Sequence, residues 1–107
     1  MKPGQFDKHP DYYEAILQIR PVDETVLNFV IESVEKRNDV YISKVKDLKT
    51  GYDVYLTNQR FSRGALVTQL KKRFRNSKVL VTKSLYGQDK MSSKLIYRAT
   101  VLFRLEK

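Results

Sequence analysis

The spacing of apolar residues changes along the chain from every second residue to a helical repeat, and this change limits the folds open to it. Residues 13–19 alternate in polarity, which is typical of a strand and places Tyr13 on the same face as Leu17 and Ile19. Residues 26–34 instead repeat apolar side chains at helical spacing, after Asp23 as a candidate N-cap. Near the C-terminus a second alternating segment has one apolar face, formed by Leu95, Tyr97, Ala99, Val101, Phe103 and Leu105.

The remaining segments complete the predicted order. Two β-rich runs near 40–47 and 52–57 flank a turn around Gly51, which indicates a hairpin. Residues 61–76 predict a second helix, capped by Ser62 and with Phe61 packed on Leu66. Two strands, 77–86 and 93–106, follow. We therefore predict an α+β fold, a two-layer sandwich of order β-α-β-β-α-β-β with a mostly antiparallel sheet and two helices on one face.

The length and the residue types exclude several kinds of protein. A chain of 107 residues suits one domain, and we expect a flexible leader over residues 1–10 and a single domain over 11–107. The chain has no Cys and one His, which excludes thiolate zinc sites, thiol catalysis and His-based metal clusters; we expect no metal and no cofactor. No apolar run approaches the roughly 18 residues of a membrane span, so we expect a cytoplasmic location and no membrane partner.

Positive charge is concentrated in the second half of the chain. Residues 1–58 carry 8 Lys/Arg and 10 Asp/Glu, whereas residues 59–107 carry 13 Lys/Arg and 2 Asp/Glu. Such segregation is typical of a polyanion partner, either nucleic acid or an anionic membrane. The alternative is a generally basic surface without a partner.

The predicted second helix carries the densest group of cations. At about 100° per residue, Arg60, Gly64, Lys71 and Arg75 project within about 60° of one another, with Lys72 beside them. We interpret this as a phosphate-contacting face, in which Gly64 allows close approach of a backbone or phosphate; a simple packing role for Gly64 is the alternative. The negative end of the helix dipole explains one or two of these cations, not all four.

The solvated face of the sheet is a second candidate. Arg98, Arg104 and Lys94 on the last strand could join Lys78 or Lys83 from its neighbour. Basic and aromatic side chains on an open sheet hold RNA in many folds, and the candidate aromatics are Tyr12, Tyr41 and Tyr55. The alternative is an ordinary solvated face with the tyrosines in the core. The polar loop 86–93, between Lys83 and Lys94, could order on a nucleic acid or remain a plain loop.

No catalytic arrangement stands out. The acids are concentrated in the first half, and Asp23-Glu24 fits a helix cap better than an acid–base pair. Phosphate-loop, dinucleotide-binding, nucleophile-elbow and zinc-protease motifs do not occur. We therefore expect no enzyme and no small-molecule substrate.

Several strings of the chain resemble a known family. YYEAILQIR, DVYISKVKDLKTGYDVYLTNQRFSRGALVTQLKKRF and VTKSLYGQDKMSSKLIYRATVLFRL resemble the central domain of the Nmd-three family over residues 11–106, closest to its archaeal-type members. These adaptors accompany the large ribosomal subunit through late maturation and, in eukaryotes, nuclear export. The segment FSRGALVTQLKKRF is also similar to the RNA-binding helix of the eukaryotic large-subunit ribosomal protein numbered twenty-two.

The resemblance implies association with large-subunit ribosomal RNA and ribosomal proteins, without catalysis. It places RNA contact on Arg60, Arg63, Lys71, Lys72 and Arg75. Family members begin with Cys-rich zinc modules, which this chain lacks, and have a further C-terminal domain. We therefore expect a fragment of a longer protein or a shortened relative.

Together these observations predict a non-catalytic ribosome-biogenesis domain that binds large-subunit RNA. The predicted RNA-binding residues are Arg60, Arg63, Lys71, Lys72, Arg75, Lys83, Lys94 and Arg98. The alternative is a protein-interaction module that binds ribosomal proteins or sister domains.

Overall fold

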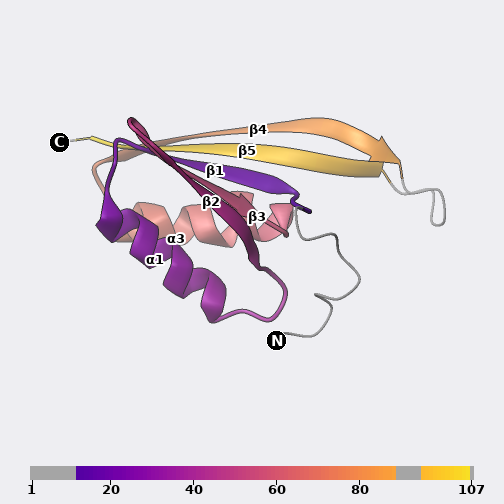
Figure 1. Ribbon diagram of the computed structural model, residues 1–107, viewed down its shortest axis with the longest axis horizontal. Coiled ribbons are helices and arrows are strands. Elements are labelled where there is room, and N and C mark those ends of the chain that lie inside the picture. The colour runs from indigo at the N-terminus through magenta and orange to yellow at the C-terminus, as the bar shows by residue number, and fades with distance from the viewer. Residues whose placement is uncertain (1–11, 89–94, 107) are drawn as a thin grey trace.

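Five strands form one mixed sheet, and the helices lie together beneath it in the computed structural model (Figure 1). The structure describes residues 12–88 and 95–106. Residues 89–93 of the loop predicted over 86–93, and the leader predicted over 1–10, lie outside the described residues, whereas residues 86–88 of that loop belong to a strand. The elements are β1 (Ala15–Arg20), α1 (Glu24–Glu35), β2 (Ile42–Leu48), β3 (Gly51–Leu56), α2 (Gln59–Arg63), α3 (Ala65–Arg73), β4 (Ser77–Gln88) and β5 (Leu95–Leu105).

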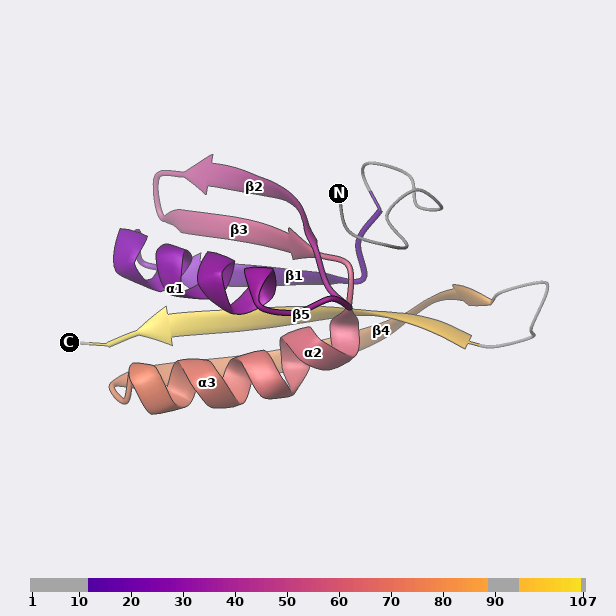
Figure 2. The same ribbon diagram turned by 90° about the horizontal axis from the view of Figure 1, so that it is seen from below.

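The order of the strands across the sheet is β2-β3-β1-β5-β4. Only the β1–β5 pair is parallel; β1–β3, β2–β3 and β4–β5 are antiparallel. The other four strands have the order β2-β3-β1-β4, which is that of the split β-α-β arrangement. β5 is inserted between β1 and β4. The predicted α+β class, the mostly antiparallel sheet and the helices on one face are confirmed (Figure 2).

The first helix forms as the apolar spacing predicts. Asp23 is its N-cap, and the Asp23 carboxylate accepts hydrogen bonds from the backbone N–H groups of Thr25 (2.9 Å) and Val26 (3.2 Å). Val26, Val30 and Val34 are one turn apart and all buried. The cap satisfies N–H groups that a helix cannot pair internally, and the valine stripe fixes α1 against the sheet.

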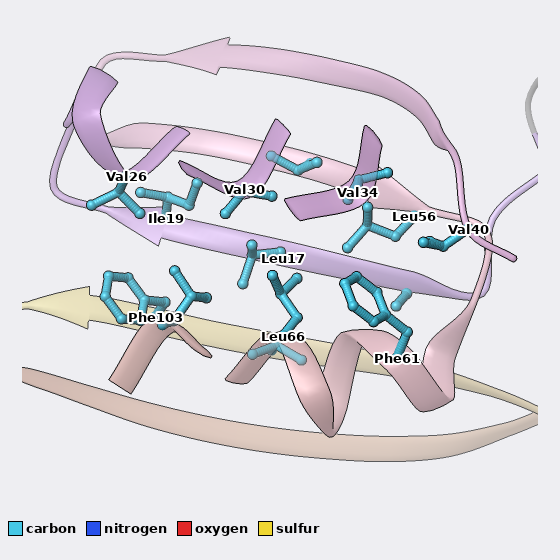
Figure 3. Close-up of a cluster of buried hydrophobic side chains, with 14 of the residues drawn as sticks. Leu17, Ile19, Val26, Val30, Val34, Val40, Leu56, Phe61, Leu66 and Phe103 are labelled. Carbon is cyan, nitrogen blue, oxygen red and sulfur yellow. The ribbon is translucent and has the colours of Figure 1, made fainter. Parts of the chain in front are cut away.

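The core lies between the helices and one face of the sheet (Figure 3). Full burial of each large aliphatic side chain contributes about 1.5–3 kcal/mol. The sheet side of this core consists of Leu17, Ile19, Val54, Leu56, Val101 and Phe103, and the helix side includes Val26, Val30, Phe61, Leu66 and Leu70. This alternation along β1, β3 and β5 fixes which residues face the helices and which face the other way.

The hairpin turn between β2 and β3 requires glycine. Gly51 has φ of +157°, and a Cβ at this position would lie 1.8 Å from the carbonyl oxygen of Ile19. The Arg20 guanidinium links β1 to the start of β3, where it donates hydrogen bonds to the Tyr52 carbonyl oxygen (3.2 Å) and to the Asp53 carboxylate (2.9 Å). The close approach of the β2–β3 turn to β1 therefore depends on the absence of a side chain at position 51.

The sheet face opposite the helices is open in the part of the chain that the structure describes (Figure 1). The register places one set of cross-strand neighbours on it: Lys78, Leu80 and Thr82 of β4, Arg98, Thr100, Leu102 and Arg104 of β5, Ile16, Gln18 and Arg20 of β1, Asp53 and Tyr55 of β3, and Lys44 and Lys46 of β2. No helix among the described residues is long and apolar enough to span a membrane.

Candidate nucleic-acid interface

Two side chains fix the start of α2. The Asn58 side-chain oxygen accepts a hydrogen bond from the backbone N–H of Phe61 (3.0 Å), which makes Asn58 the N-cap. The Glu14 carboxylate, just before β1, accepts another from the backbone N–H of Gln59 (3.0 Å). A cap and a carboxylate at an N-terminus both stabilise a short helix. They anchor α2 at the junction of β1 and β3.

The burial of one side of α2 determines where its arginines point. Phe61 and Ser62 are buried, and the Ser62 hydroxyl donates to the Asn58 carbonyl oxygen (2.7 Å). Arg60 and Arg63 therefore lie on the outward side; Arg60 is exposed, and the Nε of Arg63 donates to the side-chain oxygen of Gln59 (2.7 Å). The cap predicted at Ser62 is wrong, because the helix begins three residues earlier and Ser62 is part of its packed side.

The second helical segment is divided at Gly64. Its backbone (φ −112°, ψ −94°) is not helical, so α2 ends there and α3 begins at Ala65. A Cβ on Gly64 would lie 2.9 Å from the carbonyl oxygen of Arg60. The prediction of one continuous helix is wrong, and with it the common face computed for Arg60, Gly64, Lys71 and Arg75, because the break interrupts the 100° repeat.

The cations of α3 surround its buried stripe. Leu66 and Leu70 are fully buried. Lys72 is about 200° around the helix from Leu70, so it points away from the sheet, and Lys71 lies beside it; both are exposed. The Arg73 guanidinium lies over the ring of Phe74, 5.1 Å from its centroid.

Arg75 lies beyond the end of α3 and is exposed. Figure 2 shows α2 and α3 end to end along one side of the molecule. We use the name α2–α3 cation surface for the basic residues of this segment: Arg60, Arg63, Lys71, Lys72, Arg73 and Arg75.

Few acids oppose this surface. Residues 54–88 contain no Asp and no Glu. Asp39, close to the start of α2 through its contact with Asn58, is held by the Arg37 guanidinium at 2.8 Å, and this hydrogen bond lowers the pKa of the Asp39 carboxyl. Within the described residues, Arg60, Lys71, Lys72 and Arg75 form no ion pair. Their charge is therefore not neutralised by that part of the protein.

The predicted sheet cations do not share one face. Lys83 is opposite Ala99 in the β4–β5 register, on the helix side of the sheet, and its Nζ lies 4.5 Å from the ring centroid of Tyr97. Arg98 is on the open face, with its guanidinium 4.0 Å from the ring centroid of Tyr13 and its Nε donating to the Tyr13 carbonyl oxygen (3.2 Å). The expectation that Lys83 joins Arg98 is therefore wrong. Lys94 lies outside the described residues.

Around Arg98 the structure shows a cluster in which the sequence predicted Arg98 and Tyr55 but not Tyr13, Lys44 or Lys46. The rings of Tyr13 and Tyr55 meet edge to face at 4.9 Å, and Lys44 and Lys46 extend over Tyr55 at 4.6 and 5.5 Å. Tyr13 was predicted on the apolar face of β1, but it precedes the strand, across a bend at Glu14. Tyr55 is only 8% exposed. Its ring is packed between its neighbours and offers little surface to a stacking base.

At the opposite end of the open face lies a shallow depression lined by Arg20, Pro21, Thr50, Leu102 and Arg104. Arg20 is engaged by Asp53 at 2.9 Å, whereas Arg104 is exposed. No group of three or more His, Asp or Glu side chains that could hold a metal ion occurs in the described part of the chain.

The comparison with known families confirms the resemblance predicted from the sequence. Residues 12–105 match the family described as NMD3, second domain. No curated protein matches the chain.

Proposed function

Because the chain belongs to the NMD3 family, which is linked to the biogenesis and export of the large ribosomal subunit, we propose that it binds RNA of that subunit without catalysing a reaction. The observation that carries the proposal is the α2–α3 cation surface, where basic side chains gather in a segment without acids. Phosphate is the ligand that such a surface attracts best.

The geometry of the surface favours contact with the phosphate backbone. Arg60 and Arg63 lie on the outward side of α2, and Lys72 points outward from α3. Double-stranded RNA is recognised mainly by shape and by its phosphates and hydroxyl groups, since its major groove is too narrow for side chains to read. A group of exposed cations that form no ion pair with the described residues suits this mode, which neutralises phosphates and releases their counterions.

The same surface lacks the features of base recognition. The aromatic side chains of α2 and of the C-cap of α3 are directed into the protein: Phe61 is buried, and Phe74 packs against Phe29 and Phe103. Sequence-specific RNA binding by stacking needs exposed rings. We therefore propose that the domain reads the shape and charge of ribosomal RNA rather than its sequence.

The test is binding of a set of transcribed large-subunit ribosomal RNA fragments to the full chain and to Lys71→Glu/Arg75→Glu. A matched control, Lys36→Glu/Lys49→Glu, makes the same change in net charge at exposed lysines outside the α2–α3 cation surface. We expect the first variant to bind at least tenfold more weakly than the parent, and the control to stay within about twofold to threefold of it. Equal affinity of the parent and Lys71→Glu/Arg75→Glu would reject the assignment.

The alternative predicted from the sequence, a module that binds proteins, is supported by a different part of the molecule. The edge strand β4 exposes apolar side chains, which phosphates do not cover. RNA binding and protein binding then belong to separate surfaces.

A further inference from the structure

β4 is a long strand at the edge of the sheet. It has twelve residues, and among the described elements it pairs only with β5. An edge strand presents a row of backbone N–H and C=O groups that no neighbouring strand satisfies. Such an edge can accept an extended segment of another chain as an additional strand.

The side chains of β4 show that the strand is exposed along its free edge as well as on one of its faces. Leu80 is 60% exposed and Val81 is 39% exposed. Successive residues of a strand point to opposite faces, so an open face alone would expose just one of them. Val101, opposite Val81 on the neighbouring strand, is fully buried. The apolar surface of β4 is therefore exposed because no described strand other than β5 lies beside it.

The other edge of the sheet is less suited to pairing. β2 has seven residues and a register shift between Ile42 and Lys44. Short edge strands and bulges are devices that prevent pairing with other chains. The β4–β5 register is unbroken from Ser77 to Leu85 and shifts only beyond it, between Leu85 and Gly87. β4 thus provides the longer and more regular edge.

The charge around the β4 edge selects the partner. Lys78 and Lys83 lie on either side of Leu80 and Val81 along β4, and Arg104 lies opposite Lys78 on β5. Glu106 is 3.5 Å from Lys78, but both side chains are exposed, and an exposed ion pair of this kind contributes little. A second copy of the chain would bring lysines against lysines, and RNA would leave Leu80 and Val81 uncovered. An acidic segment with two adjacent apolar residues, and a carboxylate two positions to either side of them, complements both features.

We propose that β4 binds an extended acidic segment of a partner protein as a sixth strand of the sheet. Backbone hydrogen bonds along the edge hold the segment, and its apolar side chains cover Leu80 on one face and Val81 on the other. Its carboxylates meet Lys78 and Lys83. This site goes beyond the proposed RNA binding and does not depend on it.

The test uses a blocked peptide of about ten residues centred on Glu-Thr-Val-Val-Thr-Glu as the probe, so that each face of the added strand carries one Val and one Glu. Binding is followed by nuclear magnetic resonance of the isotope-labelled full chain. We expect peptide-dependent shifts of the amides of 78–84 and slower hydrogen exchange along the same residues, because a paired edge is protected. The same peptide methylated at alternate backbone nitrogens should fail to bind, since it lacks the donors of an added strand. Equal binding of both peptides would overturn the proposal.

Variants separate this site from the RNA surface. Lys78→Glu/Lys83→Glu should weaken peptide binding at least tenfold, whereas the matched control Lys36→Glu/Lys49→Glu and the RNA variant Lys71→Glu/Arg75→Glu should bind the peptide like the parent. Shifts centred on the open face around Tyr55 instead of on β4 would contradict strand addition. Concentration-dependent self-association that protects β4 before peptide is added would show that a second copy occupies the edge, and would also overturn the proposal.

Discussion

The salt dependence of RNA binding offers a quantitative test of the α2–α3 cation surface. Four of the residues predicted to bind RNA, Arg60, Lys71, Lys72 and Arg75, are exposed and form no ion pair with the described residues. If each neutralises one phosphate of duplex RNA, the slope of log affinity against log salt is about −3.6, taking the value of about 0.9 per phosphate known for B-DNA. Lys71→Gln/Lys72→Gln removes two contacts, so its slope should be about −1.8.

The assay is fluorescence anisotropy with one labelled ribosomal RNA fragment between about 50 and 200 mM salt. Over this range the affinity of the parent should fall about 150-fold and that of Lys71→Gln/Lys72→Gln only about 12-fold. Lys36→Gln/Lys49→Gln removes the same net charge elsewhere and should keep the slope of the parent. If the two double variants show the same slope, net charge controls binding, and the assignment of phosphates to the α2–α3 cation surface is refuted.

Three further predictions concern the fold. Gly51→Ala places a Cβ 1.8 Å from the Ile19 carbonyl oxygen; we expect a loss of about 2–4 kcal/mol in urea unfolding, and a loss below about 0.5 kcal/mol would contradict the close contact. Leu66→Ala, at a fully buried position, should lower the free energy of unfolding by about 2–5 kcal/mol with little change in m-value; a loss under about 1 kcal/mol would show that α3 is not packed as described. Burial, with the nearby carboxylates of Glu24 and Asp47, raises the pKa of the Tyr52 phenol above 10.0, so its contribution to stability is complete below that pH and is lost as the pH rises through the folded-state pKa. Tyr52→Phe should therefore lose less stability on alkaline titration than the parent, and parallel curves would refute the effect.

The order of the elements could be predicted because it depends on local periodicity. Burial of Leu17 and Ile19 on β1, and of Val101 and Phe103 on β5, follows the alternation of the sequence. The Asp23 cap of α1 could also be read directly, since it needs only a short polar side chain before an amphipathic stretch. In these segments, local preference and tertiary packing agree.

The errors arose where a single backbone conformation changes the pattern. The break at Gly64 and the bend at Glu14 each alter the direction of the residues beyond them, and neither is a change in hydrophobic period. Because of the break at Gly64, the common face predicted for Arg60 and Lys71 does not hold. Because of the bend at Glu14, Tyr13 lies on the open face. Such positions depend on contacts with distant segments, which one sequence does not reveal.

The order of the strands in the sheet could not be predicted from the sequence either. The insertion of β5 between β1 and β4 is a pairing across most of the chain length, and nothing local specifies it. The β4–β5 register decides that Lys83 and Arg98, on neighbouring strands, face opposite sides of the sheet. The candidate residues could be identified as basic, but their division between two faces required the structure.

The most direct measurement of the proposed function is a map of amide shift changes when the isotope-labelled chain is titrated with a ribosomal RNA fragment. We expect the largest changes over 59–75, the segment that carries the α2–α3 cation surface. The cluster of Tyr13, Tyr55 and Arg98 on the other side of the sheet should change little. The largest changes at that cluster, with 59–75 unaffected, would contradict RNA binding through α2 and α3.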